Sequence, residues 1–185
     1  MLFAQVKHIK LVALLSLFVG SIYAQSLQEA DLLLQPGELL NSQNWGNGND
    51  AYIDQVGGAN EVELIQTQQG APIGNLARVL QSGNWNVAVI SQNENGNQLA
   101  LIQRGDGNNY ELINQGFGNQ LVTIQDGADN HIVQHLIDSN QIQGELIQLG
   151  NGNEIISVLE GIQDSNYSIR QIGDGLKVII RQSSF

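Results

Sequence analysis

The sequence has no cysteine, so it offers no disulfide, no thiolate nucleophile and no cysteine-ligated metal. It has only two prolines and 5% aromatic residues, and its 18 acidic residues outnumber its 7 Lys and Arg residues. A chain this acidic lacks the positive footprint that nucleic acids require, so we expect no nucleic-acid partner. If the protein is exported, packing and hydrogen bonds must hold it together without crosslinks.

The first 24 residues have the three parts of a secretory signal. Lys7 and Lys10 form a basic start, and residues 11–19 form an apolar run too short to span a bilayer. Ala24 ends a plausible cleavage site at residues 22–24. We therefore predict a signal peptide over residues 1–24, with a membrane anchor as the alternative interpretation.

Residues 25–48 differ from the sequence on either side. The stretch is rich in leucine and is broken by Pro36 and Gly37. With no partner helix in the sequence, it is predicted to be a flexible N-terminal segment, with export targeting as its possible role. Its leucines are Leu27, Leu32, Leu33, Leu34, Leu39 and Leu40.

A repeat with a period of about eleven fills residues 49–185 and is clearest over residues 97–125. Nine of twelve units open with Asn, and nine have Gln at the seventh position. Such agreement sets the architecture of a chain. The units start at Asn49, Asn60, Asn75, Asn86, Asn97, Asn108, Asn119, Asn130, Ile142, Asn153, Ser165 and Leu176.

Each unit predicts one strand and one turn. Apolar residues at positions three and five alternate with other residues over positions one to seven, which is strand periodicity. Gly, Asn and Asp in positions eight to eleven are turn residues. Two units would close one rung, so the fold is predicted to be an all-β, cross-β solenoid of about twelve units in six rungs.

The first and seventh positions share the parity of the apolar positions and should also point inward. Their side-chain amides could then bond to the rungs above and below as an amide ladder. We predict that this ladder consists of Asn49, Gln55, Asn60, Gln66, Asn75, Gln81, Asn86, Gln92, Asn97, Gln103, Asn108, Asn114, Asn119, Gln125, Gln148, Asn153, Gln171 and Gln182.

The ends and the outer faces carry two further expectations. No capping helix is predicted at either end, so open strand edges should be able to template another chain. The sixth position faces outward but is often aliphatic, which predicts either a lateral docking surface or a face covered by the N-terminal segment. These residues are Ile65, Leu80, Ile102, Ile113, Ile124, Ile147 and Val158.

Chemistry that would indicate an enzyme or a bound ion is not evident. His131 and His135 are the only histidines after residue 24, and we expect them on opposite faces of a strand, where they cannot share a metal. The turns around Asp106 and Asp174 resemble calcium-binding nonapeptide turns, but the period of eleven does not fit. We predict no enzyme activity, no catalytic or cofactor-binding residue, no metal site and no small-molecule substrate.

The unit Asn-x5-Gln-x-Gly-x-x-Asn resembles the curlin repeat of curli, the amyloid fibres that bacteria secrete. Residues 51–60 and the divergent, basic last unit are most similar to the minor, nucleating curlin. In that unit Leu176 replaces Asn, and the resemblance implies that Leu176, Lys177 and Arg181 belong to the end that attaches to the cell surface.

The resemblance also implies a location and partners. The chain would be exported through the periplasm and the outer membrane to an extracellular cell-surface fibre (fimbrium) that serves adhesion and biofilm formation. Its partners would be other curlin subunits, the outer-membrane curli secretion pore and accessory factors. The alternatives are a major curlin fibre subunit and a monomeric β-solenoid adhesin or binding module.

Overall fold

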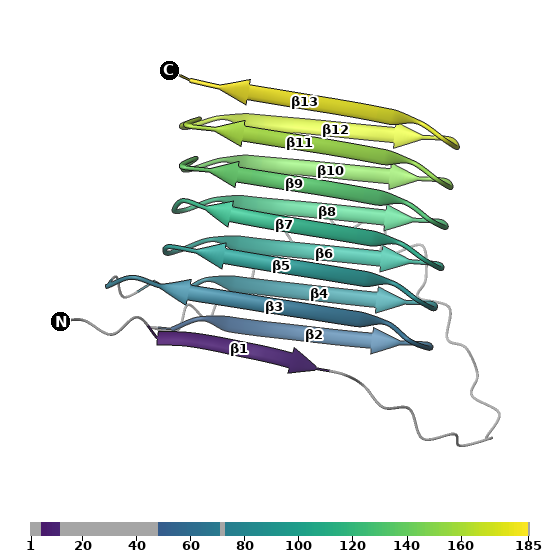
Figure 1. Cartoon of the computed structure of the whole chain (residues 1–185), viewed down its shortest axis with the longest axis horizontal. Coiled ribbons are helices and arrows are strands. Elements are labelled where there is room, and N and C mark those ends of the chain that lie inside the picture. Colours follow the sequence, from purple (N-terminus) through teal and green to yellow (C-terminus); the bar gives the residue numbers. More distant parts are fainter. Residues whose placement is uncertain (1–4, 12–47, 71–72, 185) are drawn as a thin grey trace.

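The computed structural model describes residues 48–70 and 73–184, together with the backbone of residues 5–11. These residues contain thirteen strands and no helix, and hence no helix able to cross a membrane (Figure 1). The strands are β1 (Gln5–Leu11), β2 (Asp50–Val56), β3 (Glu61–Gln68), β4 (Leu76–Ser82), β5 (Val87–Asn93), β6 (Gln98–Arg104), β7 (Asn109–Gln115), β8 (Gln120–Asp126), β9 (His131–Ile137), β10 (Gln143–Leu149), β11 (Glu154–Glu160), β12 (Asn166–Ile172) and β13 (Lys177–Ser183).

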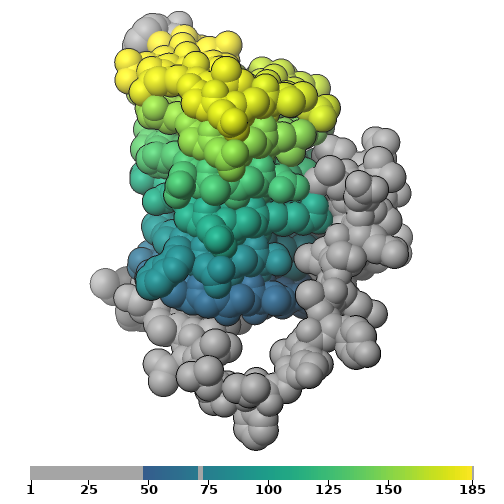
Figure 2. Space-filling view, turned by 90° about the vertical axis from the view of Figure 1, so that its right-hand side faces the viewer, coloured from purple at the N-terminus to yellow at the C-terminus, as the bar shows by residue number. Residues whose placement is uncertain are grey.

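The chain alternates between two sheets. Sheet A has the order β1-β3-β5-β7-β9-β11-β13, and sheet B has the order β12-β10-β8-β6-β4-β2. From β2 onward, equivalent repeat positions pair in parallel, so Gln103 on β6 is paired with Gln125 on β8. Figure 2 shows the resulting layers, which run from the N-terminal rungs, in blue, to the C-terminal rungs, in yellow. The predicted solenoid of twelve units in six rungs is confirmed.

The period-two pattern determines which side chains form the core. Positions three and five of both sheets pack against one another, as Leu99 and Leu121 of sheet B pack in one cluster with Tyr110 and Ile132 of sheet A. From β2 onward each strand begins at position two, one residue later than predicted, as β6 does after Asn97, and all of them except β3 end at position eight. The initial Asn lies at the junction of turn and strand, where its side chain bonds to turn carbonyls.

The two connections in each rung follow different length rules. Every connection from sheet B to sheet A lies within an eleven-residue repeat, beginning with the spacing from Asn49 to Asn60. The three longer spacings, of 15, 12 and 12 residues, all belong to connections from sheet A to sheet B. One side of the solenoid therefore keeps a fixed turn, whereas the other tolerates insertions.

Strand β1 lies within the predicted signal peptide and pairs antiparallel with β3, along the free edge of sheet A. At the same end of the solenoid, β2 is the edge strand of sheet B. Residues 12–47, which include most of the predicted signal and N-terminal segments, lie outside the described residues, as do residues 71 and 72. Removal of residues 1–24 would take away β1 and leave both β2 and β3 as edges.

Candidate functional site: the stacked amide and glycine columns

A continuous ladder of glutamine side chains runs through sheet B. Each Nε2 donates to the Oε1 of the next rung, over distances of 2.7–3.0 Å. Most of these amides also donate to a carbonyl of sheet A, as Gln103 does to Val87 O at 3.0 Å. The ladder therefore links rung to rung and sheet to sheet. Its members in order are Gln55, Gln81, Gln103, Gln125, Gln148 and Gln171.

The equivalent column of sheet A is interrupted. Gln66 donates to Gln92 at 2.8 Å, but Asn114 follows, and its buried Nδ2 has no hydrogen-bond partner within the described residues. Leu136 and Leu159 then occupy the column, and Gln182 is exposed at its end. The structure thus brings the seventh-position residues together as a ladder in sheet B only.

The asparagines of the first position act largely on the backbone. Each Oδ1 accepts a backbone N–H from the same position one rung higher, and most Nδ2 groups donate to a turn carbonyl. Asn108, for example, accepts from Asn130 N at 3.2 Å and donates to Gly127 O at 2.9 Å. These side chains therefore satisfy backbone N–H groups at the starts of the strands and carbonyl groups of the turns. The two columns are Asn49, Asn75, Asn97 and Asn119, and Asn60, Asn86, Asn108, Asn130 and Asn153.

A column of glycines occupies the fixed turns between sheet B and sheet A. All six have positive φ, between 92° and 128°. A Cβ on any of the first five would lie 1.9–2.2 Å from the carbonyl oxygen of the next glycine. The column permits turns to stack at the strand spacing only because its members have no side chain. They are Gly57, Gly83, Gly105, Gly127, Gly150 and Gly173.

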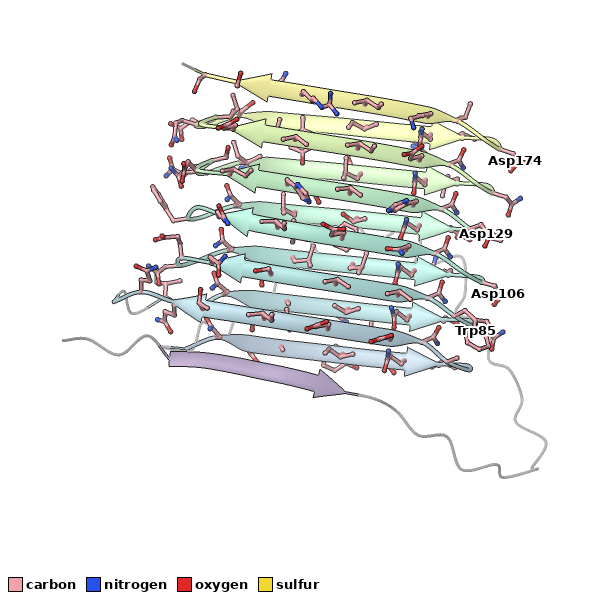
Figure 3. The ribbon with its side chains drawn as sticks, viewed as in Figure 1. Trp85, Asp106, Asp129 and Asp174 are labelled. Atoms are coloured by element: carbon pink, nitrogen blue, oxygen red, sulfur yellow. The ribbon has the colours of Figure 1, made fainter. Side chains whose placement is uncertain are left out.

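The acidic turn residues take part in the same stacking. Asp106 and Asp174 lie at the ends of rungs on the glycine side (Figure 3). Asp106 Oδ1 accepts from Asn84 N at 2.8 Å, and Asp174 Oδ1 accepts from Asn151 N at 2.7 Å. These contacts give both carboxylates a structural role in the turns. Across the described ranges, no group of three or more His, Asp or Glu side chains is placed to hold a metal.

The prediction that the two histidines lie on opposite faces of their strand is wrong. His131 and His135 are four residues apart on β9, and residues separated by an even number on a strand share a face. Both point outward, and His135 Nε2 lies 3.1 Å from Glu111 Oε1 on the neighbouring β7.

A small polar cluster interrupts the apolar core. The Tyr110 phenol donates to Gln134 Oε1 at 2.7 Å, and Gln134 Nε2 bonds to the Tyr167 oxygen on the other side. Burial raises the pKa of Tyr110 far above its ordinary value and also raises the pKa of Tyr167. Both phenols therefore stay neutral, which keeps a hydrogen-bonded chain intact inside the solenoid.

Gly144 makes room for this cluster, and filling that room should destabilise the protein. A Cβ at residue 144 would lie 2.8 Å from the Tyr167 ring and 2.9 Å from Leu121 Cδ2. We expect Gly144→Leu to lower the free energy of unfolding by about 1–3 kcal/mol through overpacking, measured by chemical denaturation. The double variant Gly144→Leu/Tyr167→Val should be more stable than Gly144→Leu; a double variant no more stable would contradict this account.

The N-terminal and C-terminal rungs carry complementary ends of the glutamine ladder. Gln55 Oε1, at the first rung of the ladder, is buried and has no partner among the described atoms. Gln171, at the last rung, accepts from Gln148, and its Nε2 donates one N–H to Glu154 O at 3.1 Å, while the second N–H has no side-chain amide above it in sheet B. The ladder thus starts with a free acceptor and ends with an available donor.

The predicted attachment residues lie at this last rung, on and just before β13. Leu176 is 40% exposed, and its N–H donates to Asn153 Oδ1 at 2.9 Å. Lys177 Nζ lies 2.6 Å from Glu154 Oε2, and Arg181 is exposed. The loss of Asn at residue 176 ends one asparagine column, so a further rung would find no side-chain acceptor there.

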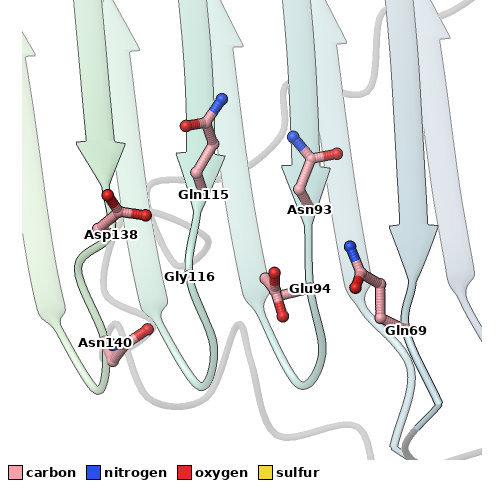
Figure 4. A pocket seen from close by; sticks show the side chains of 7 residues that line it. All are labelled: Gln69, Asn93, Glu94, Gln115, Gly116, Asp138 and Asn140. Carbon is pink, nitrogen blue, oxygen red and sulfur yellow. The ribbon is translucent and has the colours of Figure 1, made fainter.

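A shallow polar groove lies among the variable turns between sheet A and sheet B (Figure 4). Glu94 and Asp138 face it from turns that adopt positive φ, of 74° and 50°. The remaining lining is Gln69, Asn93, Gln115, Gly116 and Asn140. Its two carboxylates come from separate turns, and the groove lies on the side of the solenoid where the turns differ in length.

Comparison with known families gives one match. Residues 74–105 match the sequence model of the family described as Curlin associated repeat. The matched stretch includes β4, β5 and β6. It contributes first-position asparagines and seventh-position glutamines to the columns of both sheets. A comparison with curated proteins found no match. The family match therefore supports the resemblance to curlins over a short central part of the solenoid, where the chain carries a curlin-type repeat.

Proposed function

We propose that the protein is a secreted structural subunit of curli-type amyloid fibres at the bacterial cell surface, where it nucleates polymerisation of a second curlin. The single observation that carries the fibre function is the open glutamine ladder, with the Gln55 acceptor at one end and the Gln171 donor at the other. The curlin match over residues 74–105 supports the choice of fibre class.

Addition of a second copy would continue the solenoid without a change of register. The chain has complete rungs, so β2 of an incoming copy would stack on β12, and its β3 on β13. Equivalent positions would then meet, with Gln55 over Gln171 and Gln66 over Gln182. Each added rung would contribute parallel backbone pairing together with amide bonds, which is how an open edge templates another chain.

The charges of the two end rungs are also complementary. The first rung carries only acids on β2 and β3: Asp50, Asp54, Glu61 and Glu63. The last rung carries only bases on β12 and β13: Arg170, Lys177 and Arg181. In continued register, Arg170 would face Asp54, and Lys177 would face Glu61. Such complementarity favours head-to-tail addition and disfavours contact between two like ends.

The nucleating role rests on the resemblance of the last unit to the minor curlin. At a cell surface the basic edge formed by Leu176, Lys177 and Arg181 would be held against the envelope. Growth would then proceed from the acidic edge at β2 and β3. Export through the outer-membrane curli pore with its accessory factors, and a role in adhesion and biofilm, belong to the same proposal.

Charge reversal at the two ends tests the mode of addition. We expect Arg170→Glu/Lys177→Glu to slow fibre growth about tenfold at low salt, because like charges would then meet at the junction. Asp54→Lys/Glu61→Lys should slow growth similarly. A mixture of the two variants should recover much of the wild-type rate, because each altered end then meets an opposite charge. The measurement is thioflavin T fluorescence of chains that begin at residue 25.

Four results would count against separate parts of the proposal. A chain that stays monomeric and binds no dye would remove the fibre function and favour a monomeric solenoid adhesin. Variants that grow at the wild-type rate would remove head-to-tail charge matching alone. If traces of this protein fail to shorten the lag of a major-type curlin, or if deletion of residues 176–185 leaves the protein on cells, the nucleating or attachment role is lost.

A further inference from the structure

The outer face of sheet B is buried at its centre, although it lies on the outside of the solenoid. Ala100 and Ile102 on β6 are 1% and 5% exposed, and Val122 and Ile124 on β8 are 4% and 8% exposed. Leu80 and Ile147 pack against them from the flanking strands. We call these six residues the outer strip. Their inward neighbours on the same strands belong to the separate, central core.

The opposite sheet provides a matched comparison. Val133 on β9 occupies the same repeat position as Val122, in the next unit, but points out from sheet A and is only half-buried. Val89, at the same position on β5, is 42% exposed. Because the three valines share one repeat position and point out from equivalent strands, their place in the repeat does not produce this difference. Something must cover sheet B and leave sheet A open.

The described strands do not supply that cover. They form two sheets that pack on each other through the central core, and neither places a further layer against the outer strip. A second copy is not needed either, because the strip is buried in a single chain. We propose that the leucine-rich part of the N-terminal segment, residues 27–40, docks on the outer strip of sheet B.

The length of the segment and the point where it joins the solenoid fit this assignment. Residue 48 leads directly into β2, which is itself a strand of sheet B. From β2 to β8 are three strand spacings, or about 14 Å. The eight residue-to-residue steps from Leu40 to Gly48 can span up to about 26–29 Å. The leucines can therefore reach the strip without crossing an end of the solenoid.

The chemistry of the two surfaces is complementary. The segment offers six leucines for the aliphatic strip, together with three acids and no base over residues 25–47. Arg78 and Arg104 border the strip, and the Nε of each is buried without a hydrogen-bond partner in the described part of the chain. The outer face of sheet A instead carries acids on β3, β7 and β11, including Glu63, Glu111 and Glu154, which would repel the segment.

This docking goes beyond the proposed fibre function, because it concerns the side of the solenoid and leaves its growing ends unchanged. A docked segment would close the apolar face of sheet B to contacts between neighbouring filaments. It would also hold the beginning of the exported chain against the body of the subunit.

The absence of native cysteine allows a direct test with single thiols. In the chain that begins at residue 25, we expect the thiol of Val122→Cys to react with a maleimide at least tenfold more slowly than that of Val133→Cys. Adding Leu32→Ser, Leu33→Ser and Leu34→Ser should raise the rate at residue 122 and leave the rate at residue 133 unchanged. A second readout pairs Leu33→Cys with Val122→Cys or with Val133→Cys, and only the first pair should form a disulfide efficiently.

Two outcomes would overturn the proposal. One is equal labelling at residues 122 and 133. This result would also be obtained if residues 1–24 alone covered the strip, because the tested chain lacks them. The other is slow labelling at residue 122 that the three serine substitutions do not change, which would assign the cover to another copy or to other parts of the chain. Labelling of the soluble chain before any dye signal appears keeps this test independent of fibre formation.

Discussion

Gly105→Ala should prevent normal stacking of the solenoid and strongly slow fibre growth. The new Cβ would lie 2.2 Å from Gly127 O, which is backbone and cannot rotate away. The φ of 92° adds strain for a residue with a side chain. Together, overpacking and backbone strain should cost about 2–6 kcal/mol. The measurements are the half-time of thioflavin T growth and the denaturant midpoint of the assembled protein.

Gly152→Ala is the matched control for this substitution. Gly152 also has positive φ, of 62°, but a Cβ there meets nothing within 4 Å. Backbone strain alone should therefore cost about 1–2 kcal/mol and leave growth largely intact. If the two alanine variants behave alike, contact between stacked glycines is not what limits the rung spacing.

The central architecture was predictable because one unit contains nearly all of its determinants. Strict alternation placed Leu99 and Leu101 inward, and the same parity correctly placed Gln103 with them. The unequal turns could also be predicted from the sequence, since the three spacings longer than eleven all follow even-numbered units. The glycine column explains this asymmetry, because an insertion there would separate carbonyls that stack at backbone contact distance.

Features that depend on remote contacts were not predictable in the same way. Val122 and Val133 occupy the same position of the repeat, yet only Val122 is buried, and the cover that we propose for it comes from outside the repeat. Parity placed Asn108 inward but did not reveal that its amide would serve the backbone of the neighbouring rungs. The choice of partner depends on turn geometry, which the period alone does not specify.

Gln103→Leu should have the second-largest effect, because it cuts the sheet B ladder at its middle. Gln103 is fully buried, accepts from Gln81 at 2.7 Å and donates to Gln125 at 2.9 Å. It also donates to the carbonyls of residues 87 and 108. Leucine fits the space but leaves the Gln125 oxygen and two carbonyls short of a donor. We expect a loss of about 2–5 kcal/mol in the denaturant stability of the assembled protein.

Gln92→Leu is the control for Gln103→Leu, because it removes a buried amide that lies outside the continuous ladder of sheet B. Gln92 is equally buried at the same repeat position, but it lies in the interrupted column of sheet A. In Gln92→Leu, the Gln66 side chain on the preceding strand of sheet A would lose its acceptor. The hydrogen bond that Gln92 donates to Leu76 O is long, at 3.4 Å, so its loss should cost little. The same column already contains Leu136 and Leu159, so leucine is compatible with its geometry. We expect a loss of only about 1–2 kcal/mol here, because fewer buried groups lose a partner. A loss equal to that of Gln103→Leu would contradict this account, because the additional hydrogen bonds that Gln103 makes in the sheet B ladder would then add nothing to stability.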